Sequence, residues 1–165
     1  MKIEIRESRA HEHAKAGAVT ADAYREFARE GDPDWQEYLV RLADVADRAS
    51  RTTVLVAVEG GRILGTATLE LDGRTERESD PLRPDEAHIR MLGVAPDARG
   101  RGIGRMIMEA CEERASGSGR TLITLNTTQR MKGAQRMYES LGYSRGEDRV
   151  FPDGFVLLSY SKQLV

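Results

Sequence analysis

The sequence predicts an α/β (α+β) fold in which a mixed, mostly antiparallel sheet of six to seven strands carries helices on both faces. Two observations predict it. Segments of alternating or β-branched apolar residues take turns with segments of helical spacing, in the order β-α-α-β-β-β-α-β-α-β-β. The 165 residues are 39% hydrophobic and 32% charged, which suits a single globular domain over residues 1–165.

The first part of the chain predicts a short strand and two helices. In residues 2–6, isoleucines alternate with charged residues, as in a strand. Ser8 is expected to cap a helix that passes through residues 14–27 and ends near Gly31. The pair at residues 32–33, Asp-Pro, supplies a cap and a first-turn proline for a second helix. The apolar residues of that helix recur at helical spacing: Trp35, Leu39, Leu42, Val45, Ala46 and Ala49.

A hairpin and a loop are expected next. Residues 52–58 and 62–71 are rich in β-branched and apolar side chains, and Gly60-Gly61 between them favours a tight antiparallel turn. Residues 72–85 are charged and contain two prolines, which predicts a mobile surface loop.

A strand, a glycine-rich turn and a helix then follow one another directly. Apolar residues from Ile89 to Val94 predict a buried strand. The turn contains Arg-Gly-Arg-Gly-Ile-Gly at residues 99–104, and the helix after it is expected to end at Gly117 and Gly119. Cys111 lies on the apolar face of this helix and is interpreted as a packed thiol.

The last part of the chain predicts one more helix among strands. Thr127 or Thr128 is expected to cap this helix, which continues to Leu141 and is stopped by Gly142. Phe151-Pro152-Asp153-Gly154-Phe155 predicts a turn, because proline presets φ and glycine accepts positive φ. Strands are expected over residues 121–125, 143–150 and 155–161.

The glycine-rich turn has the features of a phosphate-binding site. The first N–H groups of a helix have no partner within the helix, and the helix dipole adds positive potential at the same place. Glycine permits close approach of a ligand and positive φ, and Arg99, Arg101 and Arg105 would supply charge for a polyanion. The alternative is a turn with solvated arginines. The dinucleotide fingerprint needs glycine in place of Arg105, and the Gly-Lys-Ser/Thr ending of the triphosphate loop is absent.

Two motifs resemble the GNAT superfamily of N-acetyltransferases. The first is its acetyl-CoA-binding motif, Arg/Gln-x-x-Gly-x-Gly/Ala, which Arg99, Gly102 and Gly104 match in register after the usual Val-x-Pro at residues 94–96. The second is Ala-x-x-x-Tyr-x-x-x-Gly-Phe/Tyr at residues 134–143. The resemblance covers residues 87 to 143 by motif, and the first 50 residues by layout alone.

The resemblance implies that the chain uses acetyl-CoA as cosubstrate. Many family members have asparagine seven residues before the motif tyrosine, where this chain has Met131, so Asn126 is a candidate to replace that contact. The residues expected at the cofactor are Leu92, Gly93, Val94, Arg99, Gly100, Arg101, Gly102, Ile103, Gly104, Arg105, Asn126, Met131 and Ala134.

The resemblance also implies direct attack of a primary amine on acetyl-CoA in a ternary complex. The amine must lose a proton, and Glu86 and His88 alternate onto one face of the strand; His88, Glu86 or a water is therefore the candidate base. Backbone N–H groups of residues 92–94 would stabilise the oxyanion, with Gly93 tolerating an irregular backbone. Tyr138 would protonate the departing thiolate. A core aromatic is the alternative interpretation of Tyr138, and a packed or surface side chain that of His88 and Glu86.

Composition excludes several other classes. The net charge of −2 disfavours a nucleic-acid partner, and no apolar stretch is long enough to span a membrane. The single cysteine excludes an internal disulfide, and the N-terminus lacks a signal-peptide core, so a cytoplasmic protein is expected. No metal site is expected, since His11 and His13 would point to different sides of a helix.

Two matters stay open at this point. A catalytically inactive acyl-CoA-binding sensor or accessory subunit of the same fold is the alternative function, because His88 and Met131 stand where the family often has other residues. The acceptor can be a small-molecule amine or a protein or peptide amine, and a preference for another acyl-CoA, or a homodimer, is not decided by the sequence.

Overall fold

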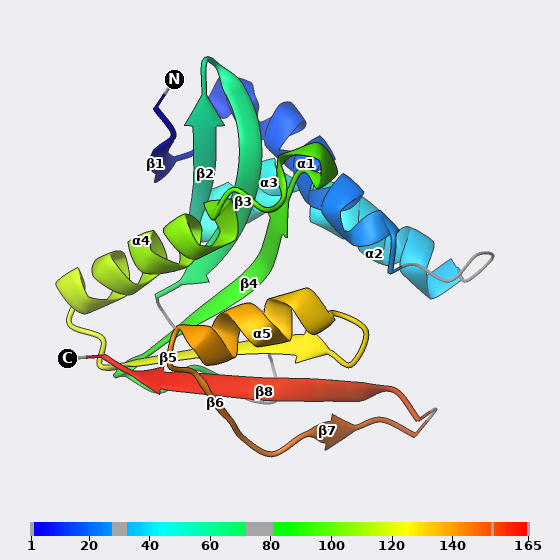
Figure 1. The fold of residues 1–165 in the computed structure, drawn as a ribbon, viewed down its shortest axis with the longest axis vertical. Coiled ribbons are helices and arrows are strands. Elements are labelled where there is room, and N and C mark those ends of the chain that lie inside the picture. Colours follow the sequence, from blue (N-terminus) through cyan, green and yellow to red (C-terminus); the bar gives the residue numbers. More distant parts are fainter. Residues whose placement is uncertain (1, 28–32, 72–80, 153, 165) are drawn as a thin grey trace. The chain divides into compact units, whose positions relative to one another are not determined.

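A computed structural model describes residues 2–27, 33–71, 81–152 and 154–164 (Figure 1). The chain divides into two compact units. The first comprises Met1–Leu69 and Met91–Cys111, and the second Glu70–Arg90 and Glu112–Val165. Strand β4 (Glu86–Val94) and helix α4 (Ile103–Gly117) each contribute residues to both units. The single domain expected over residues 1–165 stays a prediction.

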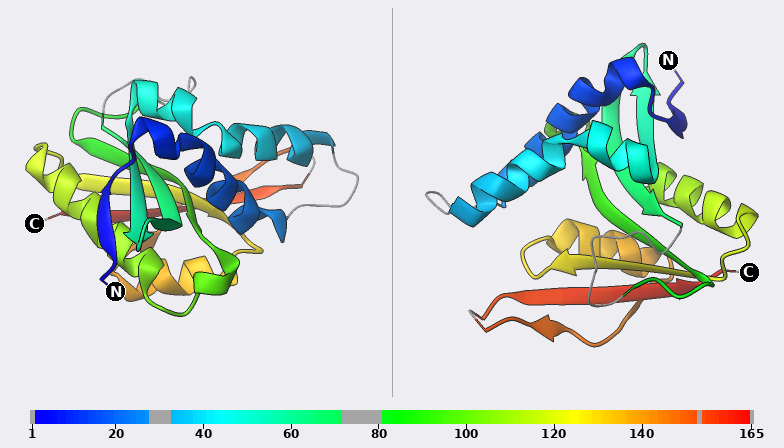
Figure 2. Two further views of the ribbon diagram at one scale, coloured as in Figure 1. Left: turned by 90° about the horizontal axis from the view of Figure 1, so that it is seen from above. Right: turned by 180° about the vertical axis from the view of Figure 1, so that it is seen from behind.

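In the first unit, β2 pairs antiparallel with both β1 and β3, drawn in blue to green in Figures 1 and 2. The register places Ile5 opposite Ala57 and Leu55 opposite Ala67. Gly60 and Gly61 have φ of 57° and 80°, the left-handed values that a primed two-residue hairpin turn requires. The predicted hairpin is therefore confirmed. The strand bounds are β1 Glu4–Glu7, β2 Thr53–Glu59 and β3 Arg62–Glu70.

Helix α1 (His13–Arg25) follows a 3-10 turn at Ala10–Glu12. The prediction that Ser8 caps this helix is wrong. The backbone N–H of Ser8 still pairs with β2, donating to the carbonyl of Val54 over 2.9 Å, and the turn begins after Arg9. The predicted end near Gly31 lies outside the described residues.

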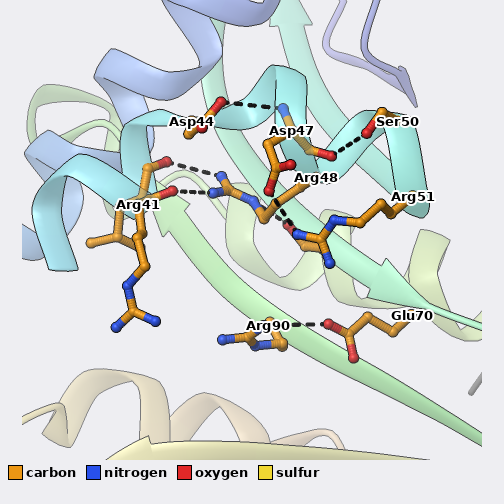
Figure 3. A network of polar contacts seen from close by, with 10 residues as sticks. Arg41, Asp44, Asp47, Arg48, Ser50, Arg51, Glu70 and Arg90 are labelled. Carbon is orange, nitrogen blue, oxygen red and sulfur yellow. Dashed lines mark hydrogen bonds and ion pairs between the residues drawn. The ribbon is translucent and has the colours of Figure 1, made fainter. Parts of the chain in front are cut away.

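The second predicted helix is two helices, α2 (Pro33–Ala43) and α3 (Val45–Arg51). Asp44 breaks the run because its carboxylate accepts the N–H of Asp47 over 3.2 Å, which starts a new helix. The buried Arg48 guanidinium then donates to the carbonyls of Arg41 over 2.5 Å and Leu42 over 2.9 Å at the end of α2 (Figure 3). A side chain thus satisfies the carbonyls that the break leaves. The proline at the first position is confirmed, while Asp32 lies outside the described residues.

The second unit contains the first part of β4 together with β5, β6, β7 and β8. Strand β4 pairs parallel with β5, and β5 pairs antiparallel with β8. The predicted strand over 143–150 is two short strands, because the four steps from Arg145 to Arg149 face only three on the partner strand, from Tyr160 to Leu157. The Arg145 guanidinium contacts both oxygens of Asp148 at 2.9 Å in the interruption. The bounds are β5 Leu122–Thr128, β6 Ser144–Arg145, β7 Arg149–Val150 and β8 Val156–Gln163.

Hydrogen bonding orders the described strands β1-β2-β3-β4-β5-β8-β6, with β7 also paired to β8. The mixed, mostly antiparallel α/β class is confirmed. The eight described strands exceed the expected six to seven because the segment before the last turn is split.

Helix α5 covers Lys132–Ser140 and begins later than predicted. Thr127 and Thr128 do not cap it, because both belong to β5 and lie opposite Leu158 and Leu157 of β8. Met131 is the residue before the helix, and Gln135 donates from its amide to the carbonyl of Thr128 over 2.9 Å. The stop at Gly142 is confirmed by its φ of 93°.

Two further expectations concern loops and membranes. The loop predicted for residues 72–85 lies mostly outside the described residues. Within the described part of the chain, every helix is too short or too polar to cross a bilayer.

Candidate active site

The predicted phosphate loop joins β4 to α4 in the first unit. A 3-10 turn at Pro96–Ala98 leads into Gly100 and Gly102, whose φ angles are 81° and 78°. A Cβ added at either glycine would meet no protein atom within 4 Å. Left-handed backbone therefore demands glycine here, and the space beside it is open to a ligand. The predicted strand, glycine turn and helix are all confirmed as elements.

The helix start offers donors in the way the sequence indicated. The first hydrogen bond back from α4 runs from the N–H of Met106 to the carbonyl of Gly102 over 3.0 Å. The N–H groups of Ile103 and Gly104 precede that bond, in the first turn, where N–H groups have no acceptor within the helix. This geometry, together with the helix dipole, fits the phosphates of a nucleotide-containing cofactor.

The loop arginines are paired with carboxylates that the sequence analysis did not single out. Arg101 donates to Glu59 at 2.6 and 3.3 Å, and on the other side of the hairpin turn Arg62 holds Asp97 at 2.6 and 2.8 Å. The Arg101 hydrogen bonds lower the pKa of Glu59, and those of Arg62 lower the pKa of Asp97. The opposite charges at the two ends of the hairpin would predict a pair between Glu59 and Arg62, so no local signal in the sequence indicates the observed contacts.

Arg99 connects the loop to helix α1 within the first unit. Its guanidinium forms an ion pair with Glu26 and donates to the carbonyl of Ala23 over 3.2 Å. This carbonyl is in the last turn of α1, where the helix dipole favours a cation. Arg105 lies 3.9 Å from Glu109 one turn further along α4. The loop cations are thus held in place by their own unit.

The backbone of β4 is irregular, but at a different residue from the expected one. Met91 has φ of 52°, whereas Gly93 has no left-handed backbone. A Cβ on Gly93 would lie 2.8 Å from the Cβ of Ala23, so this glycine is needed for the close approach of α1. The prediction that Gly93 tolerates the irregularity is corrected: Met91 carries it, packed in a buried cluster with Leu39 and Leu42.

The second unit brings Glu86 and His88 together through Thr124. The register of the parallel pair places Thr124 of β5 opposite His88, and Glu86 lies two residues earlier on the same face. The Thr124 hydroxyl donates to Oε2 of Glu86 over 2.5 Å, and its oxygen lies 2.8 Å from Nδ1 of His88. Both Glu86 and His88 are buried. The shared face predicted for these two residues is confirmed, whereas Thr124 was missed.

Arg90 continues this row of polar side chains. Its guanidinium lies 3.4 Å from Oε1 of Glu70, the last residue of β3, and Figure 3 shows the pair. The Glu70 carboxylate is buried, and the Arg90 guanidinium gives it a partner of opposite charge. The strand thus carries alternating ionisable residues at 86, 88 and 90 in the second unit.

Tyr138 lies in an aromatic cluster of the second unit. Its ring packs against Tyr143 and Tyr160, with centroid separations of 6.1 and 5.7 Å. Burial raises the pKa of Tyr160, whose hydroxyl lies 3.4 Å from Glu139. Tyr138 is buried, so the ring contributes to packing whatever its hydroxyl does.

The remaining predicted cofactor residues of this unit lie around the start of α5. Asn126 donates from its amide to Oγ of Ser159 over 3.1 Å, so this amide already binds β8. Met131 accepts a 3.4 Å contact from the hydroxyl of Thr127. Ala134 is half-buried on α5. Residues 92–105 belong to the first unit, and Glu86, His88, Asn126, Met131, Ala134 and Tyr138 to the second.

Two further observations concern the single cysteine and a possible metal site. Cys111 is fully buried, which confirms the packed thiol. Across the residues with a described placement, no group of three histidine, cysteine or carboxylate side chains is arranged to hold a metal ion.

Comparisons with known proteins agree with one another. Residues 19–143 match the model of the acetyltransferase (GNAT) family. The fold is similar to that of yncA from Salmonella typhimurium, solved with its cofactor acetyl-CoA, at a TM-score of 0.72 and 20% identity over 99% of this chain and 94% of that one. An acetyltransferase of the GNAT family from Streptococcus pneumoniae has a similar fold, at a TM-score of 0.71 and 17% identity over 99% of this chain and 100% of that one. The ribosomal-protein-S18-alanine N-acetyltransferase from Escherichia coli is similar at a TM-score of 0.70 and 18% identity over 99% of this chain and 94% of that one.

Proposed function

We propose that this chain, which belongs to the acetyltransferase (GNAT) family, transfers an acetyl group from acetyl-CoA to a primary amine by direct attack. The observation that carries the proposal is the loop with two left-handed glycines at the start of α4. It provides backbone donors, a helix N-terminus and open space at the same place. The relative from Salmonella typhimurium, which has the same fold, binds acetyl-CoA.

The loop residues would hold the cosubstrate. The N–H groups of residues 102–105 would donate to its phosphates, and Arg99, Arg101 and Arg105 would contribute positive charge around them. Residues 92–94, Asn126, Met131 and Ala134 complete the proposed binding residues. Acetyl-CoA supplies the activated acyl group as a thioester.

Three groups of this chain would carry the chemistry. A free amine with a pKa near 10 is neutral only about once in a thousand molecules at pH 7, so His88, Glu86 or a water must take its proton. The amine nitrogen then bonds to the carbonyl carbon while backbone N–H groups of residues 92–94 donate to the oxyanion. The carbon–sulfur bond breaks, and the Tyr138 hydroxyl would donate a proton to the leaving thiolate. The acylated nitrogen loses its second proton at this stage, and this proton would return Tyr138 to its neutral form.

The test is a turnover screen with free-thiol detection. Purified protein receives acetyl-CoA and, in separate wells, a polyamine, an aminoglycoside, amino acids and peptides with free amines. We expect amine-dependent release of CoA for at least one class, with mass spectrometry showing the acetylated amine. Acetyl-CoA binding by calorimetry without turnover on any acceptor would instead favour the sensor or accessory subunit.

A series of acyl-CoA compounds determines which acyl donor the protein prefers. Propionyl-CoA and succinyl-CoA are compared with acetyl-CoA at equal concentration on the best acceptor. A higher kcat/KM with acetyl-CoA is expected. Better turnover with a longer acyl group would contradict the acetyl assignment while leaving acyl transfer intact.

A further inference from the structure

The contact between Glu86, Thr124 and His88 determines where the hydrogens lie. A threonine hydroxyl has one hydrogen to donate and two lone pairs with which to accept. Thr124 uses its hydrogen on Oε2 of Glu86, at 2.5 Å. Its oxygen lies 2.8 Å from Nδ1 of His88, so that contact is a hydrogen bond only if Nδ1 donates. In the neutral ring, the hydrogen is therefore on Nδ1.

Glu86 is set up to remain an acceptor. Its other oxygen, Oε1, accepts the backbone N–H of Arg83 over 3.2 Å, and the Arg83 Nε lies 3.9 Å away. Both oxygens of Glu86 thus accept a hydrogen bond, one from the backbone and one from the Thr124 hydroxyl. With the hydrogen of Thr124 directed at Glu86, the direction of the remaining hydrogen bond, between Thr124 and His88, is fixed.

We propose that Thr124 is a positioning residue that links Glu86 to His88 and holds the imidazole as the Nδ1–H tautomer, leaving Nε2 as the basic nitrogen. This rests on the proposed function, because the basic nitrogen would take the proton of the acceptor amine. It selects His88 over Glu86 as the base. When Nε2 gains that proton, the positive ring donates more strongly to Thr124, and the hydroxyl passes the stabilisation on to the carboxylate.

The arrangement is set by register rather than by chance contact. Thr124 lies opposite His88 in the parallel pairing, and Glu86 pairs with Leu122 two residues earlier. All three polar side chains thus emerge on the same face of two neighbouring strands. His88 and Glu86 are 3% and 6% exposed, so bulk water does not compete freely for these hydrogen bonds.

Nitrogen-15 NMR of the histidine rings tests the proposal without any turnover. Two-bond proton–nitrogen correlations distinguish the Nδ1–H from the Nε2–H tautomer at a pH where the ring is neutral. His88→Asn identifies the His88 signals against those of His11 and His13. We expect Nδ1–H for His88 in the parent protein. An Nε2–H ring there would overturn the proposal, and this measurement needs no variant that might fail to fold.

Two variants at the threonine then connect tautomer and rate. Thr124→Val keeps the shape and removes the hydroxyl, so the Nδ1–H preference should disappear and kcat should fall about 10- to 100-fold with the Kd of acetyl-CoA unchanged. Thr124→Ser keeps the hydroxyl and should restore both. A valine variant that loses the tautomer and keeps its kcat would overturn the catalytic role. If no acceptor is turned over while the parent ring is Nδ1–H and the valine variant loses it, the hydrogen-bond link stands and the acetyl-transfer proposal fails.

Discussion

The carboxylate of Glu59, at the end of β2, accepts two hydrogen bonds from the guanidinium of Arg101 in the glycine-rich loop, at 2.6 and 3.3 Å. Glu59 therefore places a negative charge beside the region that we propose binds the phosphates of acetyl-CoA. Both side chains reach solvent, so the pair itself contributes little to folding stability. Its effect should appear in ligand binding.

We predict that Glu59→Gln tightens acetyl-CoA binding about two- to fivefold. The substitution removes a repulsive charge and leaves an amide oxygen to hold Arg101, and the effect is modest because the charge is exposed to solvent. Calorimetry at low and high salt measures the Kd of acetyl-CoA for both proteins, and the gain in affinity should become smaller as the salt concentration rises. Glu4→Gln, which removes an exposed carboxylate that pairs with the half-buried Arg6 elsewhere in the first unit, is the control. Weaker binding by Glu59→Gln would mean that holding Arg101 in place matters more than the charge.

Gly102 should be required for acetyl-CoA binding, in addition to avoiding the backbone strain that another residue would have at this position. We predict that Gly102→Ala costs about 1–2 kcal/mol of unfolding free energy, because an alanine must adopt the left-handed region, and that it also abolishes acetyl-CoA binding. Gly61 provides a matched control: its φ of 80° is close to the 78° of Gly102, and both have open space around them. Gly61→Ala should lose similar stability in urea unfolding and keep its Kd. Equal Kd values for the two variants would argue against the loop as the phosphate site.

The Tyr138 hydroxyl is expected to act in turnover only. Tyr138→Phe should lower kcat about 10- to 100-fold and leave the Kd of acetyl-CoA unchanged, since the buried ring and its packing persist. Tyr143→Phe removes a hydroxyl from the neighbouring ring of the same cluster and should change kcat by less than about twofold. Stopped-flow thiol release measures both. An unchanged rate in Tyr138→Phe would remove this residue from the acid role.

Glu12 should make the free energy of unfolding depend on pH in the acidic range. Its carboxylate accepts from the Arg6 guanidinium at 2.8 and 2.7 Å and from the backbone N–H of Arg9 at 2.8 Å. The Arg6 hydrogen bonds lower the pKa of Glu12 from 4.5 to about 2. Because the pKa is lower in the folded chain, the stabilisation is complete above the unfolded value of 4.5 and is lost as the pH falls toward 2.

Urea unfolding of the parent and of Glu12→Gln checks this at several pH values. We expect Glu12→Gln to cost about 1–3 kcal/mol at pH 7. The difference between the two proteins should narrow as the pH falls below 4.5. A difference that stays constant down to pH 3 would show that the carboxylate charge is not what stabilises this contact.

Local chemistry explains which parts of the fold were predictable. The hairpin, the glycine turn and the stop at Gly142 depend on left-handed backbone, which glycine marks directly in the sequence. The division of the second helix was missed because it depends on Arg48, whose side chain reaches back to carbonyls six and seven residues earlier. Helical periodicity does not register such a contact, since the apolar spacing continues across the break.

The candidate site shows the same limit. Glu86 and His88 could be placed on one face because alternation along a strand is local. Thr124 could not, because its position opposite His88 depends on the pairing register of two strands separated by a helix. Glu59 and Asp97 escaped notice for the same reason: each meets its arginine through folding of a hairpin against a loop.

Met91 has a consequence for how β4 can vary. Its left-handed φ of 52° falls in the middle of the strand, at the residue where the first unit takes over from the second. Burial nevertheless alternates through it: Met91 and Gly93 are buried, and Arg90, Leu92 and Val94 are half-buried. A residue at position 91 therefore has to accept a left-handed backbone and a buried, apolar position at once. Glycine, asparagine and aspartate are the residues that adopt this backbone most readily, and none of them would fill the space of a methionine in the cluster with Leu39 and Leu42.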